Sequence, residues 1–396
     1  MAQPPPPPPP HPSSASSSSS LSNLIRLTPL QIADLPGHAD LPPPPDSSNG
    51  RSSERPALGA FLTALLDDGA AFLEPSTFSS RFKHLSKKKS APSAAPVEVL
   101  SHSIPASAIK RVQWSSSSGG PGGDSTPTGV DAGSGAGDGI ANTSPRQISR
   151  VSRSPPPSST LDAEYWIARR SVHRDISSKD ATQPGHASWD EFVYGLRDNH
   201  SKHEADFTPT LYDAHRVADW TDMLHQAQVQ ETLMAKGYTA CSLGVFEMCH
   251  AIPPPLSPRC FAVVVATANL DEDSFIAVTV PVDLTSTSGN GPLSTALYST
   301  GRNVHEGATP QQRKRVVAGV YAAVETVRRR RRRDKAERET EAEIEWVMAT
   351  TSDAKGSLPL WVQKLSVPGA VAKDVGYFLK WIRGVDDGEI NKQPRQ

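Results

Sequence analysis

The sequence is poor in the features that mark secreted, membrane-spanning and nucleic-acid-binding proteins. Its three cysteines, Cys241, Cys249 and Cys260, are an odd number, which argues against a disulfide scaffold and favours a reducing compartment. The longest apolar run, from Cys260 to Ala268, is far shorter than the ~20 residues of a membrane span. The 41 basic and 42 acidic residues leave a net charge of −1, which argues against a whole-surface nucleic-acid footprint. The first residues lack the apolar segment of a secretory signal, so we expect a cytoplasmic protein that binds no nucleic acid.

Motifs of common enzyme and metal sites are also lacking. The sequence has no Walker loop, no Gly-x-Ser-x-Gly elbow and no set of kinase motifs. His200 and His203, followed by Glu204, do not have the spacing of a helical zinc site, and we interpret them as solvated side chains at a helix end. Cys249 and Cys260 lack further ligands at metal spacing, so we expect them to be buried in strands. We therefore expect no metal, no cofactor and no recognisable catalytic residue, although dispersed catalytic residues would escape this test.

Proline and tryptophan divide the chain into a front part that can bury little and a back part that holds the core. Of the 37 prolines, 25 precede residue 158, whereas six of the seven tryptophans follow residue 160. This distribution predicts one main domain of roughly 200–250 residues behind a long Pro- and Ser-rich front. The predicted organisation is a disordered tail at 1–55, a helical segment packing on the main domain at 56–113, a Ser/Gly/Pro-rich linker at 114–160, the main domain at 161–384 and a tail at 385–396.

Two low-complexity features of the front part could be mistaken for binding sites. Polyproline from Pro4 to Pro10 can adopt the extended helix that SH3-type domains bind, but we interpret it first as a solvated tail. The glycines between Gly133 and Gly139 have no strand before them and no helix after them, so they predict a linker and not a phosphate-binding loop.

Apolar periodicity predicts helices at both ends of the ordered chain and strands between them. Pro56 to Leu73 has helical spacing, and a capping box from Ser188 to Glu191 opens a second helix. The predicted strands are Tyr165 to His173, Tyr238 to His250, Arg259 to Asn269, Ser274 to Asp283, Val316 to Arg328 and Ile344 to Thr351, with a hairpin tip at 271–273. Gly369 to Arg383 carries an apolar stripe, and Pro359 and Pro368 are expected to break the backbone before it. A curved antiparallel sheet wrapped around this long C-terminal helix would bury both apolar faces, with a ligand cavity between them.

A run of six arginines follows the fifth of these strands. It comprises Arg328, Arg329, Arg330, Arg331, Arg332 and Arg333, and an acidic stretch follows it. A block of like charge is usually a solvated, mobile loop, and this is our first interpretation. The functional alternatives are a peripheral contact with an anionic membrane, worth ~1 kcal/mol per basic residue, and a nuclear-import patch.

Three stretches of the sequence resemble a known family. They are Trp166 to His173, Ile252 to Phe261 with its Ser-Pro-Arg-x-Phe element, and Glu345 to Asp374. Together they resemble a fungal family of unknown function that is related to START lipid-transfer domains of the SRPBCC superfamily. The resemblance implies an α+β, helix-grip START-like fold and a non-enzymatic carrier or sensor of a lipid or other hydrophobic molecule. Cys260 replaces the acidic residue of the START motif, and Val265 stands where some sterol-binding members have an arginine.

These observations lead to a main hypothesis and two alternatives. The main hypothesis is a START-like module that binds a hydrophobic ligand between the sheet and the C-terminal helix. Its pocket candidates are Asp283, Glu325, Trp346, Trp361, Val371, Val375, Phe378 and Ile382, with the two carboxylates as polar anchors and the aromatic residues equally explained by core packing. The alternatives are a helix-grip enzyme of the cyclase or hydrolase type, which a buried carboxylate–histidine pair would favour, and an interaction scaffold recruited through its polyproline tail.

Overall fold

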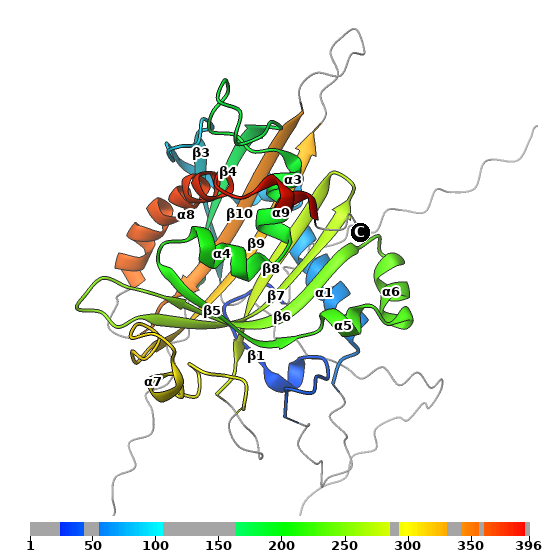
Figure 1. The fold of residues 1–396 in the computed structure, drawn as a ribbon, viewed down its shortest axis with the longest axis vertical. Helices are drawn as coiled ribbons and strands as arrows, with labels where there is room; N and C mark the ends of the chain where they lie inside the picture. Colours follow the sequence, from blue (N-terminus) through cyan, green and yellow to red (C-terminus); the bar gives the residue numbers. More distant parts are fainter. Residues whose placement is uncertain are drawn as a thin grey trace, which may run out of the picture.

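The computed structural model describes residues 24–42, 55–105, 163–285, 293–330, 342–355 and 360–392, and gives the backbone alone for 360–366 (Figure 1). The polyproline segment and the predicted linker lie outside these residues. The strands are β1 (Leu30–Gln31), β2 (Lys83–Lys88), β3 (Val97–Pro105), β4 (Ala163–Arg174), β5 (Leu211–Asp219), β6 (Thr239–His250), β7 (Arg259–Asp271), β8 (Ser274–Asp283), β9 (Val317–Arg330) and β10 (Glu343–Asp353). The helices are α1 (Leu58–Phe72), α2 (Pro75–Arg81), α3 (Trp189–Phe192), α4 (His200–Phe207), α5 (Thr221–Leu224), α6 (Ala227–Met234), α7 (Asn303–Glu306), α8 (Leu360–Ile382) and α9 (Asp387–Lys392), with one π-helical turn at Val193–Arg197.

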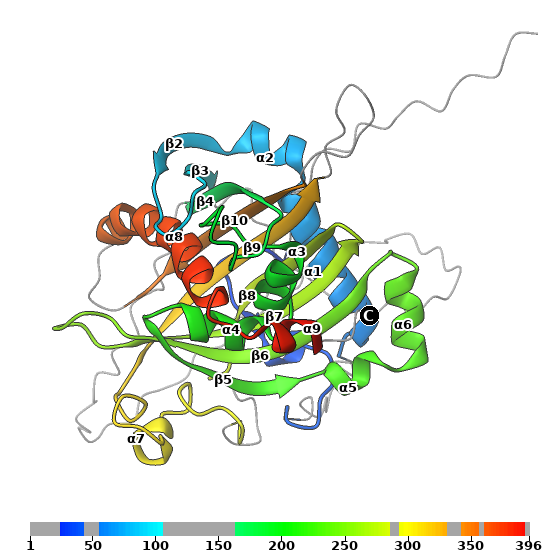
Figure 2. The same ribbon diagram turned by 45° about the horizontal axis from the view of Figure 1, so that its top comes forward.

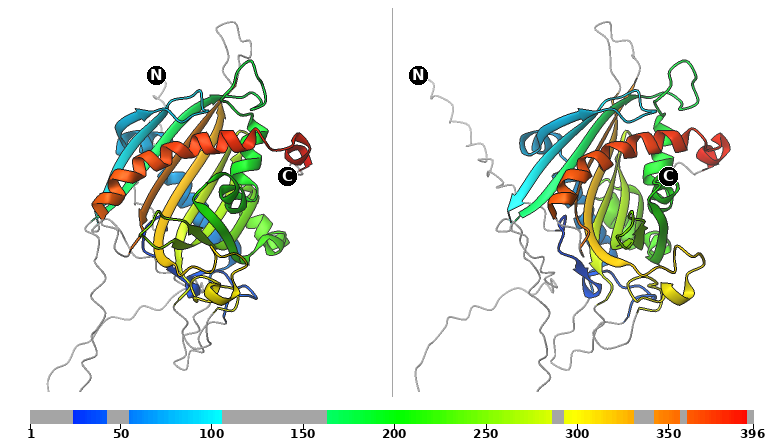
Figure 3. Two further views of the ribbon diagram at one scale, coloured as in Figure 1. Left: turned by 60° about the vertical axis from the view of Figure 1, so that its left-hand side comes forward. Right: turned by 90° about the vertical axis from the view of Figure 1, so that its left-hand side faces the viewer.

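Nine of the strands form one continuous antiparallel path. Its order is β2-β3-β4-β10-β9-β8-β7-β6-β5, and the short β1 pairs in parallel with the end of β8. The sheet curves around α8, which crosses the strands on its concave side (Figure 3). The predicted α+β architecture, a curved antiparallel sheet wrapped around a long C-terminal helix, is therefore confirmed.

Side-chain alternation along the strands builds a separate apolar core on each face of the sheet. In β8, Phe275 belongs to the core under α8, whereas Ile276 and Val278 belong to the core under α1. Helix α1 packs against β7 and β8 on the convex face, and α8 contacts β3 and β4 on the concave face. Because both faces are covered, β8 is an almost unbroken apolar run, and its predicted bounds match the observed ones.

A glycine allows α1 to approach the sheet closely. A Cβ atom at Gly69 would lie 2.5 Å from Cγ2 of Val278. A glycine in mid-helix costs up to ~1 kcal/mol relative to alanine in helix propensity. At this position the cost is offset by close packing of α1 on β8.

The predicted disordered tail at 1–55 is wrong for residues 24–42. This segment places Leu24, Ile25, Leu35 and Leu41 in the convex core. The backbone N–H of Leu27 donates to the carboxylate of Glu164 at 2.7 Å, which fastens the segment to β4. The segment is irregular apart from β1 and one 3₁₀ turn, so its apolar residues follow no single period that a sequence pattern could reveal.

Two further predictions about the ends of the domain need correction. The expectation of a helical segment at 56–113 holds for α1 and α2, but residues 83–88 and 97–105 are strands that extend the sheet beyond β4. The outer strand β2 is short, Lys-rich and mostly exposed, as edge strands commonly are, so it lacks an alternating pattern. Helix α8 begins at Leu360 and contains Pro368, so this proline does not break the backbone before the helix, and the tail after 385 contains α9.

Candidate functional site

A buried arginine, a carboxylate and a tryptophan meet on the concave face of the sheet. Arg169 on β4 donates through Nη2 to Oε1 of Glu325 on β9 at 3.0 Å. Trp346 on β10 donates its indole N–H to the same oxygen at 2.6 Å. The guanidinium carbon of Arg169 also lies 3.8 Å from the centroid of the Trp346 ring, a cation–π contact. The neighbouring strands β4, β10 and β9 bring the three residues together, because all three side chains point to the same face.

Arg169 carries donors without acceptors in the described part of the chain. The residue is 2% exposed, and neither Nε nor Nη1 has a hydrogen-bond partner there. Burying a charged group is costly unless its hydrogen bonds are made, so unpaired guanidinium donors are uncommon in packed cores. The free N–H groups can bind an oxygen acceptor on the concave face.

Two acidic side chains from the covering helices interact with Arg169 and Glu325. Burial raises the pKa of Asp374 on α8 to about 7; Arg169 opposes this shift, and Glu204 and Glu325 add to it. Burial also raises the pKa of Glu204 on α4. Both side chains are only half-buried, as is Tyr321 on β9, whose pKa is raised by burial and by Glu204. Polar groups from β4, β9, α4 and α8 thus converge on the concave side of the sheet, and three of them are partly accessible to solvent.

The raised pKa of Asp374 predicts that the stability of the protein depends on pH. In the unfolded chain an Asp loses its proton near pH 4, whereas in the folded chain Asp374 keeps it to about pH 7. The proton is bound more tightly in the folded state, so this contribution to stability is present below pH 4 and is lost as the pH rises towards 7. We expect Asp374→Asn to stabilise the protein by ~2–3 kcal/mol at pH 8 and by little at pH 4.

Urea unfolding at the two pH values measures this effect. Asp222→Asn on α5, at an exposed position, is the matched control and should change stability at neither pH. A gain at pH 4 equal to that at pH 8, or no gain at pH 8, would contradict the role given to Asp374.

Five of the predicted pocket residues form one packed cluster. They are Trp346, Val371, Val375, Phe378 and Ile382, all buried between α8 and the sheet. The ring centroid of Phe378 lies 5.0 Å from that of Phe192 and 5.3 Å from that of Trp346, in tilted and edge-on contacts. Glu325 joins this cluster through its hydrogen bond with Trp346. These five apolar side chains hold α8 on the sheet, directly beside the Arg169–Glu325 pair.

One other predicted pocket residue is not brought to this place, and the structure does not describe the side chain of another. Asp283 lies at the end of β8 beside Gln31 of β1, and its carboxylate accepts hydrogen bonds from the backbone and hydroxyl of Thr285. Its role there is to stabilise a turn. Trp361 lies on the part of α8 for which only the backbone is described, so the position of its side chain lies outside the described structure.

Sequence reasoning missed Arg169, Glu204, Tyr321 and Asp374 as candidate site residues. The available signal was weak: Arg169 alternates with the inward-facing Tyr165 and Ile167 on β4, which marks it as a charge on a buried face. The pairing of β4 with β10 and not with β5 could not be read from the sequence, and this pairing places Arg169 beside Glu325.

The histidine pair on α4 has structural partners. A ring nitrogen of His200 bonds the carbonyl of Leu196 at 2.6 Å, and one of His203 bonds the carbonyl of Tyr194 at 2.8 Å. His203 is buried and stacks on the Tyr194 ring at 4.5 Å, so the interpretation of a solvated side chain is wrong for this residue. Within the residues that the structure describes, no group of three or more His, Cys, Asp or Glu side chains could hold a metal ion.

The predicted buried cysteines are confirmed. Cys249 and Cys260 lie directly opposite each other on β6 and β7, and both are buried free thiols. Burial raises the pKa of Cys249, so the uncharged thiol is favoured.

The arginine run begins inside β9, so the interpretation of a mobile loop is wrong for its first three members. Arg329 points to the concave side, where it bonds Asp273 at 2.6 Å and lies over the Trp189 ring. Arg328 and Arg330 lie on the opposite face, and Arg330 pairs with Glu345. Arg331, Arg332 and Arg333 lie outside the described residues.

The Ser-Pro-Arg-x-Phe element secures the chain before α8. Arg259 is 1% exposed, and its Nε donates to the carbonyl of Ala354 at 2.7 Å. A second, longer bond of 3.4 Å reaches the carbonyl of Lys355. The motif arginine therefore ties the start of β7 to the connection between β10 and α8, and so helps to position the helix that covers the concave face.

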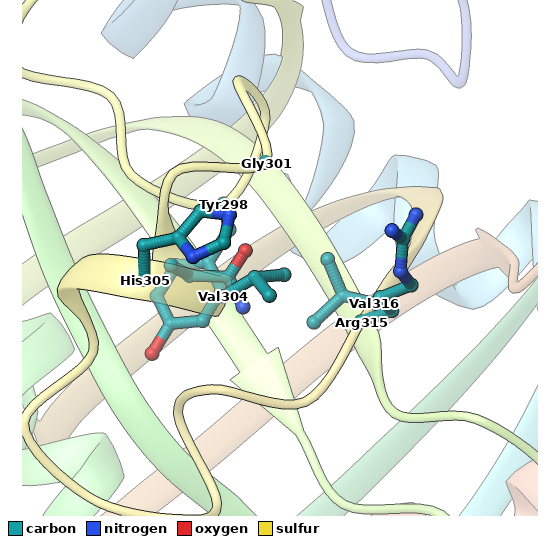
Figure 4. Close-up of a pocket in the computed structure, with 7 residues that line it drawn as sticks. Tyr298, Gly301, Val304, His305, Arg315 and Val316 are labelled. Atoms are coloured by element: carbon teal, nitrogen blue, oxygen red, sulfur yellow. The ribbon is translucent and has the colours of Figure 1, made fainter.

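A pocket near α7 lies apart from this polar group. It has a volume of about 220 Å³ and is lined by Tyr298, Gly301, Asn303, Val304, Arg315 and Val316, together with His305. Figure 4 shows Val304 and Val316 facing each other across it, while the Arg315 guanidinium points away from Tyr298 and His305. Its imidazole and guanidinium side chains, those of His305 and Arg315, are solvent-exposed, so it lacks the buried polar group that the concave face carries.

None of the helices in the described ranges is long and apolar enough to cross a membrane.

A comparison with curated proteins finds no match. Solved structures similar to the chain include human STARD10, with a TM-score of 0.38 and 12% identity over 80% of each chain. Human StAR-related lipid transfer protein 5 gives a TM-score of 0.38 and 9% identity over 81% of this chain and 98% of that chain. The lipid transfer and protein localization domain of human StarD13 (DLC2) gives 0.33 and 9% over 79% and 95%.

A family model covers most of the sheet and the gripping helix. It matches residues 166–382, which is more than half of the chain and includes Arg169, Glu204, Glu325 and Asp374. The match begins within β4 and ends at the last residue of α8, so it includes residues of β4, β9, α4 and α8, which together supply the polar group. The chain therefore belongs to the family described as "Protein of unknown function (DUF3074)".

Proposed function

We propose that this protein is a non-enzymatic, START-like carrier or sensor that binds a lipid or another hydrophobic molecule between the concave face of the sheet and α8. The observation that carries the proposal is Arg169, a buried guanidinium whose Nε and Nη1 lack partners in the described residues. A ligand oxygen that accepts from these donors would make up the hydrogen bonds that Arg169 lacks.

The surroundings of Arg169 define the chemistry of the ligand. Apolar and aromatic groups occupy the concave face on both sides of the polar group, in one cluster under α8 and in another that contains Met248, Phe261 and Val265. A ligand between these clusters meets apolar side chains along its length and, at Arg169, a cation with unused hydrogen-bond donors. A ligand with an apolar body and a carbonyl, carboxylate or phosphate oxygen at one end can contact the apolar side chains and also accept a hydrogen bond from Arg169.

Val265 bears on the class of lipid. This residue, at the position where some sterol-binding START proteins have an arginine, is buried in the second apolar cluster of the concave face. The buried cation with unused donors on this face, Arg169, comes from β4 instead. We therefore propose that the ligand's polar end lies near β4 and α8, away from the position of Val265 on β7.

Cellular placement and partners form part of the proposal. We place the protein in the cytoplasm, with peripheral contact to anionic membranes through Arg328 to Arg333. The observation that supports contact at the described end of this run is that Arg328 and Arg330 reach the outer, convex face of the sheet. An SH3-type partner for Pro4 to Pro10 is proposed on sequence grounds alone.

A helix-grip enzyme is the second candidate, and one contact favours it. Nε2 of His200 lies 4.0 Å from Oε2 of Glu204, a carboxylate with a raised pKa on the concave side. This separation exceeds hydrogen-bond reach, and Nδ1 of His200 bonds the carbonyl of Leu196. The two candidates differ in what they do to a bound molecule: a carrier releases it unchanged, and an enzyme releases a product.

Amide hydrogen exchange of α8 tests ligand binding on this face. In a carrier the helix must move to admit the ligand, so 369–382 should exchange faster than β8 and should slow when a total lipid extract is added. The strand β8, buried on both faces, is the internal control. Exchange in α8 as slow as in β8, and unchanged by lipid, would overturn the proposal.

A further inference from the structure

A second pocket lies on the opposite side of the sheet, away from α8. It has a volume of about 280 Å³ and lies between α2, the edge strands and the convex face of β9 and β10. Its apolar lining comprises Leu73, Pro75, Phe78, Phe82, Leu100 and Val347. Several of these residues belong to the convex core with α1, and none belongs to the core under α8. Figure 2 shows α2 and β2 at the end of the molecule where β3, β4 and β10 lie.

One side of this pocket is cationic. Arg170, Arg328 and Arg330 line it, and the only carboxylate among its lining residues is that of Glu345. Arg170 donates through Nε to one oxygen of Glu345 at 2.7 Å, and Arg330 donates to the other oxygen. Both oxygens of Glu345 are therefore engaged by two arginines. The pocket consequently carries an excess of positive charge.

Arg328 is the arginine that this network leaves available. Its side chain makes no hydrogen bond or ion pair with the residues that the structure describes, although it is half-buried against the apolar lining. Alternation along β9 places it on the same face as Arg330, two residues later. A guanidinium beside apolar side chains presents a planar fork of donors that matches a carboxylate or a phosphate.

We propose that this convex-face pocket binds a small amphiphilic anion, an alkyl or aryl body with one carboxylate or phosphate group, whose charged end meets Arg328. The apolar lining accepts the body, and the excess of arginine over carboxylate selects a negative charge. The volume is just below the usual ~300–1,000 Å³ of small-molecule sites, which limits the ligand to a short chain or a ring. The site does not depend on ligand binding at the concave face, because it shares no residue with the polar group there. Arg328 and Arg330 also belong to the proposed membrane contact, so the vesicle experiment below separates the two roles.

Isothermal titration of the full-length chain with octyl phosphate tests the proposal. Inorganic phosphate and octanol supply the charged and the apolar half of the probe separately, and each should bind at least ~10-fold more weakly than octyl phosphate. Octanoate, which has a carboxylate in place of the phosphate, should bind within about tenfold of octyl phosphate, because an arginine side chain can donate two hydrogen bonds to either group.

Two pairs of variants locate the binding. Ser79 lines the pocket at an exposed position of α2, so Ser79→Trp should block it, whereas Ser80→Trp, at the next exposed position, should bind normally. Arg328→Gln should weaken octyl phosphate binding by about tenfold or more. Arg216→Gln, on the distant edge strand β5, should leave it unchanged. Equal melting temperatures of the variants and the parent show that loss of binding is not loss of fold.

Four outcomes would overturn the proposal. Inorganic phosphate that binds as tightly as octyl phosphate would make this a plain anion site. Octyl phosphate binding that survives both Ser79→Trp and Arg328→Gln would place the ligand elsewhere. Binding to phosphatidylserine vesicles, sensitive to Arg328→Gln, without binding of the free probes would identify a membrane surface as the partner. Binding that occurs only after the acidic residues of 334–341 are changed to Ser would identify that segment of the chain as the occupant.

Discussion

A chain that begins at residue 43 should fail to fold cooperatively, whereas a chain that begins at residue 24 should melt within a few degrees of the full-length protein. The segment 24–42 contributes a set of buried apolar side chains to the convex core: Leu24, Ile25, Leu27, Leu30, Ile32, Leu35 and Leu41. Burial of one such side chain is worth ~1.5–3 kcal/mol, so their joint loss is at least as large as the ~5–15 kcal/mol that holds a typical domain together.

Polar contacts add to the expected effect of this truncation. Trp220, fully buried next to α5, donates its indole N–H to the carbonyl of Gly37 at 3.0 Å, and a ring nitrogen of His38 bonds the carbonyl of Asp219 at 2.9 Å. Removing the segment would leave the indole N–H of Trp220 without its acceptor. It would also remove the backbone N–H of Leu27 that donates to the carboxylate of Glu164. The truncation therefore removes hydrogen bonds of buried groups in addition to exposing apolar surface.

Circular dichroism melting of the two truncations, with a point variant, measures this contribution. Leu35→Ala, at a fully buried position, should cost ~2–5 kcal/mol, and Thr28→Ala, at an exposed position of the same segment, should cost little. Cooperative melting of the chain that begins at 43, at the temperature of the full-length protein, would contradict the role given to residues 24–42.

Arg169→Ala should destabilise the protein by ~3–5 kcal/mol, because it leaves the buried carboxylate of Glu325 without its cationic partner. The side chains of the pair are 3% and 9% exposed, so water can do little to replace the lost guanidinium. Arg170→Ala is the matched control on the same strand: its side chain is 40% exposed and points to the other face. Its buried partner Glu345 keeps a second arginine, Arg330, so the loss should be smaller, about 1 kcal/mol.

A double variant separates the structural role of Arg169 from its proposed role in binding. In Arg169→Met with Glu325→Gln, the buried charges are removed together, and the amide oxygen of Gln can still accept from the Trp346 indole. We expect its free energy of unfolding to return to within about 2 kcal/mol of the parent, while ligand binding stays lost. Recovery of both stability and binding would mean that Arg169 only neutralises Glu325.

The central strands of this fold could be predicted because their residues obey simple rules. β7 and β8 are apolar runs joined at an acidic tip, and the sequence places the bounds of β8 as observed. β2 and β5 could not be predicted in the same way. They are the two edges of the sheet, where exposure removes the need for an apolar pattern.

The candidate site was only partly predictable, for a different reason. Glu325 and Trp346 stand out as a charge and an aromatic on apolar strands, and the structure places them in contact. Arg169 is separated from Glu325 by more than 150 residues, and only the insertion of β10 between β4 and β9 brings the two side chains together. Long-range strand order is a property of the whole sheet, so no local pattern around Arg169 predicts its partner.

Native mass spectrometry of the full-length protein, after incubation with a total lipid extract and removal of free lipid, tests the central claim most directly. We predict one bound apolar molecule with an oxygen-bearing polar end, released chemically unchanged. The Arg169→Met, Glu325→Gln variant should lose this molecule while it still melts cooperatively, within several degrees of the parent. Arg170→Ala should retain the molecule, because that side chain lies on the other face of the sheet. A parent protein that binds no molecule from the extract, or a double variant that binds as well as the parent, would contradict a ligand site at Arg169.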